Sequence, residues 1–149
     1  MKKIILIMTV LAFIVAGCGM VAKAPVNKID SIKTTGKEEG SIDKEFFKQM
    51  VAQKPANVTL VDVRTPFEYN AGHFADAKHV FINDMYEKGC ASVTDKIPKE
   101  GYVVFVCASG ARAGEMYFGL KDDCKYPDMK RLFFLDANIM YAPTGPVVK

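Results

Sequence analysis

The chain has few of the side chains from which metal sites are built. It contains two histidines, His73 and His79, and four cysteines, and no two cysteines are separated by only two residues. Structural zinc sites are built from C-x2-C pairs and closely spaced histidines. We therefore expect neither a metal site nor a cofactor, and we interpret both histidines as structural imidazoles.

The chain also lacks a strong excess of one charge. It has 20 lysines and arginines against 17 acidic residues, and 18 against 17 once Lys2 and Lys3 are set aside. A nearly neutral chain has no basic footprint for nucleic acid, so no nucleic-acid partner is expected. With 149 residues, half of them hydrophobic, the sequence predicts one globular domain and excludes a multi-domain or wholly disordered chain.

The N-terminus has the order of a secretory leader: two lysines, then an uncharged stretch from Ile4 to Ala22. Within it, Val15-Ala16-Gly17-Cys18 resembles the bacterial lipoprotein box, in which the cysteine is acylated and becomes the new N-terminus. Residues 1–17 are thus predicted to be a signal peptide and Cys18 a lipidation site. The alternative is an uncleaved helix, because 19 uncharged residues just span a core of about 30 Å.

Both interpretations place the domain outside the cytoplasm, on the periplasmic side of the cell envelope, with the membrane as a partner. The stretch from Met20 to Gly40 is rich in lysine, threonine, glycine and glutamate and cannot bury enough surface to offset its ordering entropy. Residues 18–40 are predicted to be a flexible tether, and residues 41–149 to be the folded domain.

Within residues 41–149, helical and strand patterns alternate. Asp43 is a predicted N-cap for a helix that ends near Gln53, with apolar residues at helical spacing. Short apolar runs predict strands, and a second helical pattern runs from Ala111 to Asp122. The predicted strands are Val58–Val63, Lys78–Ile82, Tyr102–Val106 and Leu132–Leu135. Strands separated by helices imply an α/β fold with a parallel β-sheet flanked by helices.

The strongest candidate for a site directly follows the predicted strand Tyr102–Val106. There, Cys107-Ala108-Ser109-Gly110-Ala111-Arg112 leads into a helical pattern. Ligands of such sheets bind beyond the carboxyl ends of the strands, and a loop of small residues can turn its N–H groups inward around an anion. A cysteine beside a helix N-terminus and an arginine is favoured as the nucleophilic thiolate. The alternative is that Cys107 is a small core residue.

Two motifs resemble those of the rhodanese-like sulfurtransferase family. The stretch Asp62-Val63-Arg64-Thr65-Pro66-Phe67-Glu68-Tyr69-Asn70-Ala71-Gly72-His73-Phe74-Ala75-Asp76-Ala77 is similar to its D-x-R-x-x-x-E-[YF]-x-x-G-H-[IF]-x-x-A signature. The loop from Cys107 to Arg112 is similar to its C-x-x-G-x-R catalytic loop. The resemblance covers about Ser41 to Lys149 and implies a single rhodanese-like domain.

The resemblance implies a sulfurtransferase in which Cys107 takes a sulfane sulfur from a small donor, such as polysulfide or thiosulfate, and passes it as a persulfide to a thiol or other thiophilic acceptor. The loop residues Ala108, Ser109, Gly110 and Ala111 would supply N–H groups to the persulfide, and Arg112 would brace the loop and help hold an anionic donor. Asp62 and Arg64 are expected to fix polar contacts around the loop, and Glu68, Gly72 and His73 to be structural.

Other functions remain alternatives: a non-catalytic binding module of the same fold, or a thiol oxidoreductase of the cell envelope. Cysteine phosphatases use a C-x5-R loop, and Cys107 and Arg112 enclose only four residues. Many thiosulfate-using members carry a basic residue directly after the catalytic cysteine, where Ala108 stands here. After the last predicted strand, Asp136-Ala137 stands where family members often have Gly-Gly. Asp136 is interpreted either as a carboxylate near the entrance of the site or as a solvated helix cap.

Cys90 and Cys124 form an even remainder after Cys18 and Cys107, which in an exported protein favours a disulfide. Two buried thiols, or one thiol that resolves a Cys107 intermediate, are the alternatives.

Overall fold

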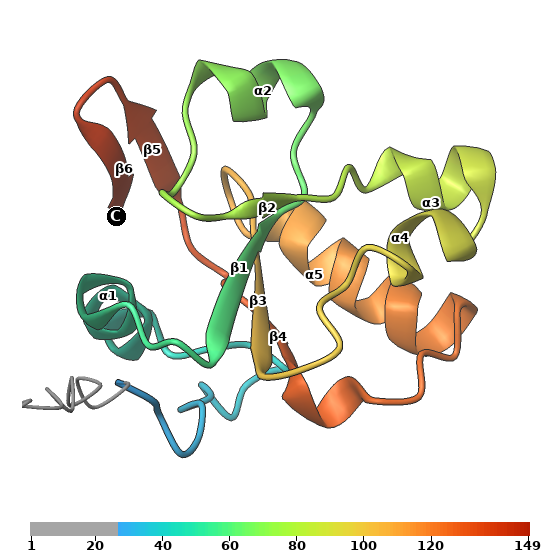
Figure 1. The fold of residues 1–149 in the computed structure, drawn as a ribbon, viewed down its shortest axis with the longest axis horizontal. Helices are drawn as coiled ribbons and strands as arrows, with labels where there is room; N and C mark the ends of the chain where they lie inside the picture. The colour runs from blue at the N-terminus through green and yellow to red at the C-terminus, as the bar shows by residue number, and fades with distance from the viewer. Residues whose placement is uncertain (1–26) are drawn as a thin grey trace, which may run out of the picture.

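The computed structural model describes residues 27–149, so Cys18 and the predicted signal peptide lie outside the described residues. Four parallel strands form the central sheet in the order β2-β1-β3-β4, and a separate antiparallel pair, β5-β6, follows them (Figure 1). The strands are β1 (Val58–Asp62), β2 (Lys78–His79), β3 (Tyr102–Val106), β4 (Leu132–Phe134), β5 (Ile139–Ala142) and β6 (Gly145–Val148). Between residues 27 and 149, no helix combines the length and the apolar character that crossing a membrane requires.

Helices cover both faces of this sheet (Figure 1). Helix α1 (Lys44–Gln53) covers one face. The other face is covered by α3 (Asn83–Lys88), α4 (Ala91–Thr94) and α5 (Ala111–Phe118), with a π-helical turn η1 (Gly119–Asp123) and a 3-10 turn η2 (Met129–Arg131). Helix α2 (Pro66–Ala71) lies beyond the carboxyl end of β1 (Figure 1) and buries none of its residues. This is the predicted α/β architecture of one domain with a parallel sheet.

Alternation along the strands divides the core into two clusters. Val103 and Phe105 of β3 face α3, α4 and α5, whereas Val104 and Val106 face α1 and the β5-β6 hairpin. All four side chains are fully buried. A strand with both faces covered has a continuous run of apolar residues in its sequence, and this is why β3 could be predicted from the sequence.

Helix α1 begins where the sequence predicts. The Asp43 side chain accepts a hydrogen bond from the main-chain N–H of Phe46 and so satisfies one of the free donors of the first turn. Ile42, just before the cap, and Phe47 are both buried in the same core cluster. Lys54, in a left-handed conformation, ends the helix after Gln53.

Several predicted bounds differ from the structure. Strand β2 has two residues where five were expected, because the chain leaves the sheet after His79 towards α3. Helix α5 ends at Phe118 and continues as the π-helical turn rather than as an α-helix to Asp122. Strands β1 and β4 each end one residue earlier than predicted.

The predicted tether is wrong for residues 27–40, which lie against the domain. The side chain of Asn57 exchanges two hydrogen bonds with the main chain of Ile29, at 3.0 and 2.7 Å. Thr34 forms a β-bridge to Ile42. Polar composition indicated a solvated segment, but Ile29 and Ile32 also pack against the core cluster that contains α1, so apolar contacts add to these hydrogen bonds in holding the segment.

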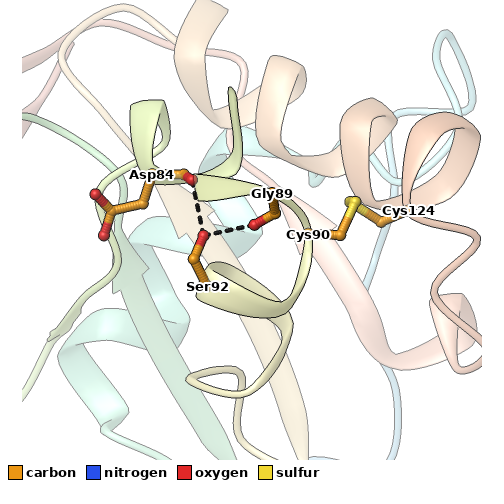
Figure 2. The surroundings of a disulfide bond; sticks show 5 residues. All are labelled: Asp84, Gly89, Cys90, Ser92 and Cys124. Atoms are coloured by element: carbon orange, nitrogen blue, oxygen red, sulfur yellow. Dashed lines mark hydrogen bonds between the residues drawn. A yellow bond between two sulfur atoms is a disulfide. The ribbon is translucent and has the colours of Figure 1, made fainter. Parts of the chain in front are cut away.

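Cys90 and Cys124 are joined by a disulfide, which agrees with the first of the three interpretations of this pair (Figure 2). Cys90 directly precedes α4, and Cys124 directly follows the π-helical turn. The hydroxyl of Ser92 donates to the carbonyls of Asp84 and Gly89, so the α3-α4 connection next to the bridge is also held by hydrogen bonds (Figure 2). The bridge therefore ties α4 to the far end of the α5 segment.

Candidate active site

The predicted catalytic loop, Cys107 to Arg112, leaves the carboxyl end of β3 and runs into α5. In a parallel sheet the carboxyl ends of neighbouring strands meet at one edge. Accordingly, Asp62 at the end of β1 and the segment after β4 lie on either side of the loop, since β1 and β4 are the two neighbours of β3. The sequence motifs are therefore brought to one place.

The loop turns a main-chain donor towards the sulfur. The N–H of Gly110 donates to Sγ of Cys107 at 3.1 Å, and Cys107 is 1% exposed. Gly110 has φ +90°, a conformation that disfavours other residues, and a Cβ there would meet Oδ1 of Asp136 at 2.6 Å. A glycine is thus required to bring the N–H onto the sulfur, where it would stabilise negative charge.

The β5-β6 hairpin holds the loop from the other side. The N–H of Ile139 donates to the carbonyl of Ala108 at 2.8 Å, and the hydroxyl of Tyr141 lies 3.4 Å from the carbonyl of Cys107. Burial raises the pKa of Tyr141 well above its ordinary value, so the phenol remains protonated and available as a donor. Sequence reasoning missed Tyr141, because nothing in the hairpin sequence indicates which strand ends it contacts.

Arg112 is held by Glu68 rather than left free at the mouth. Its two terminal nitrogens each donate to a different carboxylate oxygen of Glu68, both at 2.7 Å. Glu68 also accepts from Thr65 in the capping box that begins α2. The guanidinium of Arg112 thus contacts Glu68 rather than the loop itself, so its bracing of the loop stays a prediction. The interpretation of Glu68 as merely structural was incomplete, because Glu68 positions Arg112.

Glu68 provides a test of this ion pair through pH. The hydrogen bonds from Arg112 lower the pKa of Glu68 from 4.5 to about 2. Because the folded-state value is depressed, the stabilisation is present above about pH 4.5 and is lost as the pH falls towards 2. We expect Glu68→Gln to reduce the free energy of unfolding by about 1 kcal/mol at neutral pH, since the pair is partly solvated. The difference from the native protein should vanish near pH 2 in urea titrations.

Glu100→Gln is the matched control, because Glu100 is exposed and forms no ion pair within residues 27–149. A difference between native protein and Glu68→Gln that stays constant from pH 7 to about pH 2 would contradict the assigned pair.

Asp62 and Arg64 form a buried ion pair beside the loop, as expected for residues that fix polar contacts. The guanidinium of Arg64 reaches Asp62 at 2.7 Å and the carbonyl of Gly72 at 2.6 Å. It also lies over the ring of Tyr141, 3.3 Å from the centroid. Asp62 is 0% and Arg64 3% exposed. The pair thus links β1, the α2 segment and the hairpin around Cys107.

Both histidines make structural contacts. Nδ1 of His73 lies 2.9 Å from the carbonyl of Tyr69, and Nε2 of His79 lies 2.7 Å from that of Arg64. Both rings stack on Tyr69. In the described part of the chain, no three histidine, cysteine or acidic side chains gather as they would around a metal ion.

Asp136 lies beside the catalytic loop, next to Gly110, which is the N-cap residue of α5. It follows β4 in an irregular segment and is exposed, and a Cβ on Gly110 would lie 2.6 Å from its Oδ1. The structure therefore places this carboxylate both near the catalytic loop and at the N-terminal end of α5, so it does not separate the two interpretations.

This combination of a parallel sheet, a cysteine loop at a strand end and a supporting Asp-x-Arg segment agrees with the comparison with family models. The model described as the rhodanese-like domain matches residues 43–136, and the chain therefore belongs to the rhodanese-like family. The β5-β6 hairpin lies beyond the matched residues. No curated protein matches the chain significantly.

Solved structures share the fold. A rhodanese-like domain protein from Staphylococcus aureus is 20% identical, covers 66% of this chain and 85% of its own, and has a TM-score of 0.50. A protein of unknown function from Rhodopseudomonas palustris, described as a possible tyrosine phosphatase, is 15% identical over 72% of this chain and 76% of its own, with a TM-score of 0.51. At these identities the likeness concerns the fold alone.

Proposed function

We propose that this protein is a sulfurtransferase that moves a sulfane sulfur from a small donor to a thiol or other thiophilic acceptor through a persulfide on Cys107. The contact between the Gly110 N–H and Sγ of Cys107 carries the proposal, because it aims a fixed dipole at the atom on which charge would rest. Membership of the family and the retained Cys107 and Arg112 support it.

The reaction balances without a further oxidant. The Cys107 thiolate attacks the outer sulfur of the donor, a new S–S bond forms, and the old bond breaks. The leaving group, sulfite from thiosulfate or a shorter polysulfide, departs with the electron pair. In the second half, an acceptor thiolate attacks the outer sulfur of the Cys107 persulfide, and the Cys107 thiolate is regenerated.

The alternatives fit the site less well. A thiol oxidoreductase would need a second thiol to resolve Cys107, and among residues 27–149 the other two cysteines are bonded to each other. A phosphatase would need the longer C-x5-R loop, whereas Cys107 and Arg112 enclose four residues. A binding module has no need for a sulfur with a donor aimed at it.

Multiple turnover tests the proposal against the binding module. The purified domain with polysulfide and excess dithiothreitol should release sulfide at a rate proportional to protein concentration and far above the uncatalysed exchange. If sulfide is released no faster than in buffer alone, with polysulfide or thiosulfate as donor and with several acceptor thiols, the sulfurtransferase proposal fails.

Ala108 determines which donor we expect. A basic side chain at this position would give thiosulfate a charge-assisted hydrogen bond worth roughly 1.5 to 3 kcal/mol. Its absence predicts that polysulfide, whose terminal sulfur is attacked without a sulfonate being held, is the better donor. Ala108→Arg should raise kcat/KM for thiosulfate by roughly 10- to 100-fold and change the polysulfide value far less.

Ala108→Gln is the control for side-chain length without charge. Steady-state kinetics with both donors decide the matter. Thiosulfate used as well as polysulfide by the native protein, or an equal gain in the glutamine variant, would show that charge at position 108 does not set donor choice.

We also propose that the protein works in the cell envelope, on the periplasmic side, anchored by lipid on Cys18. The lipoprotein-type leader supports this, and so does the Cys90–Cys124 disulfide, because such bridges persist in oxidising compartments. Two or more acyl chains suffice for stable anchoring.

We therefore expect the mature protein from bacterial membranes to begin at Cys18 and to carry acyl chains, which mass analysis of its N-terminal peptide would detect. The Cys18→Ala variant should incorporate no labelled fatty acid. An unmodified chain that still begins at Met1 would instead support the uncleaved helix.

A further inference from the structure

The two arginines of the site are already neutralised by carboxylates. Arg112 is bound through both terminal nitrogens by Glu68, and Arg64 is bound through two nitrogens by Asp62. Ala108 adds no charge to the loop. The site therefore presents no uncompensated cation from these residues to an approaching donor.

Asp136 adds a negative charge that has no such partner. It is exposed and forms no ion pair with a lysine or arginine of residues 27–149. Gly110 lies between Asp136 and the sulfur, which allows their separation to be bounded. The main-chain nitrogen of Gly110 is 3.1 Å from Sγ of Cys107, and a Cβ on Gly110 would lie 2.6 Å from Oδ1 of Asp136. With covalent bonds of about 1.5 Å, the carboxylate oxygen is within roughly 9 Å of the sulfur.

The N-terminal end of α5 lies next to Asp136, but no lysine or arginine is among the described residues that surround this carboxylate. Beside the loop is a hollow of about 210 Å³, lined by Gly110 and Ala111 together with the acidic residues Glu38, Glu115 and Asp136. Glu115 accepts a hydrogen bond from the neutral hydroxyl of Tyr86, which leaves its charge in place. The flank of the catalytic loop formed by Asp136 is therefore acidic.

We propose that Asp136 is a specificity-determining residue of the Cys107 site, which disfavours anionic sulfur donors and favours persulfides of thiols that carry a positively charged amine. This inference rests on the proposed sulfurtransferase function and narrows its substrate class. The bonding steps are those of any persulfide donor: the Cys107 thiolate attacks the outer sulfur of R–S–SH, Cys107–S–SH forms, and R–S⁻ leaves.

The size of the effect follows from Coulomb's law. At roughly 9 Å a unit charge changes the affinity for another by about two-fold in a water-like dielectric and by about twenty-fold at an effective dielectric of 20. Two donors that differ by two units of charge should thus be discriminated by about five-fold or more at low ionic strength. Because Asp136 is exposed, salt should weaken this discrimination.

The test compares two persulfides of nearly equal size: that of cysteamine, which carries an amine, and that of 3-mercaptopropionate, which carries a carboxylate. We expect Asp136→Asn to lower the ratio of their kcat/KM values by about five-fold. Asp95→Asn, which removes an exposed carboxylate beyond α4, should leave the ratio unchanged. In the native protein, raising salt from about 20 to about 500 mM should reduce use of the amine donor and increase use of the carboxylate donor.

The possible results distinguish a failure of the role assigned to Asp136 from a failure of the proposed sulfurtransferase function. If both donors turn over and neither Asp136→Asn nor salt changes their ratio, Asp136 does not set specificity, and the sulfurtransferase function stands. If no donor turns over and no sulfur reaches Cys107, the proposed function fails and the inference fails with it.

Discussion

Replacing Cys107 by serine is expected to abolish sulfur transfer. The hydroxyl is neither ionised at neutral pH nor able to form a persulfide, so loss of the nucleophile should reduce turnover on the order of 10³-fold or more. Serine has nearly the same volume and its oxygen can accept the hydrogen bond from Gly110. The free energy of unfolding should therefore change by less than about 1 kcal/mol.

Sulfide release with polysulfide and a thiol acceptor, measured beside urea unfolding of the same preparation, separates chemistry from folding. Ser109→Ala is the control within the loop, because Ser109 is exposed and its side chain forms no hydrogen bond among the described residues. A Cys107→Ser variant that folds normally and keeps a substantial fraction of the native rate would place the chemistry elsewhere.

Removing the disulfide should lower the free energy of unfolding more than any other substitution proposed for this protein. The bridge closes a loop between Cys90 and Cys124, 34 positions apart. In the chain-entropy model, this constraint on the unfolded chain stabilises the protein by about 3 to 4 kcal/mol. The double variant Cys90→Ser/Cys124→Ser is therefore expected to unfold at least about 10 °C lower than the native protein.

The disulfide lies at the opposite end of the α5 segment from the catalytic loop. Residues 111–123 form this segment, and a helix of that length spans roughly 20 Å. Folded molecules of the double variant should thus transfer sulfur at the native rate at temperatures well below their midpoint. Native protein treated with reductant should unfold at the same lowered temperature as the double variant. If the thermal midpoint is unchanged in both, the bridge contributes nothing to stability.

Much of the fold could be predicted because its elements have distinct local patterns. The run that becomes β3 is apolar throughout since both faces are covered, and Asp43 before an apolar helical pattern indicates the start of α1. The β5-β6 hairpin was not predicted. Its strands have four residues each, with exposed Met140 and with Gly145 and Pro146 in place of an alternating pattern.

The sequence identified the candidate nucleophile, its loop and the supporting residues Asp62 and Arg64, but not the contacts made by Glu68 and Tyr141. Glu68 and Arg112 are 44 positions apart, and no periodicity links a residue of α2 to one of α5. Tyr141 reaches Cys107 only because the hairpin folds back over the sheet edge. Long-range pairs of this kind depend on how the elements assemble, which local sequence patterns do not specify.

Intact-mass analysis of the purified domain after brief exposure to polysulfide tests the central claim most directly. One sulfur atom, about 32 Da, should be gained per molecule in the native protein and lost again on addition of a thiol acceptor, and Cys107→Ser should gain none. A native protein that gains no sulfur, or a Cys107→Ser variant that gains as much, would contradict the assignment of Cys107 as the sulfur carrier.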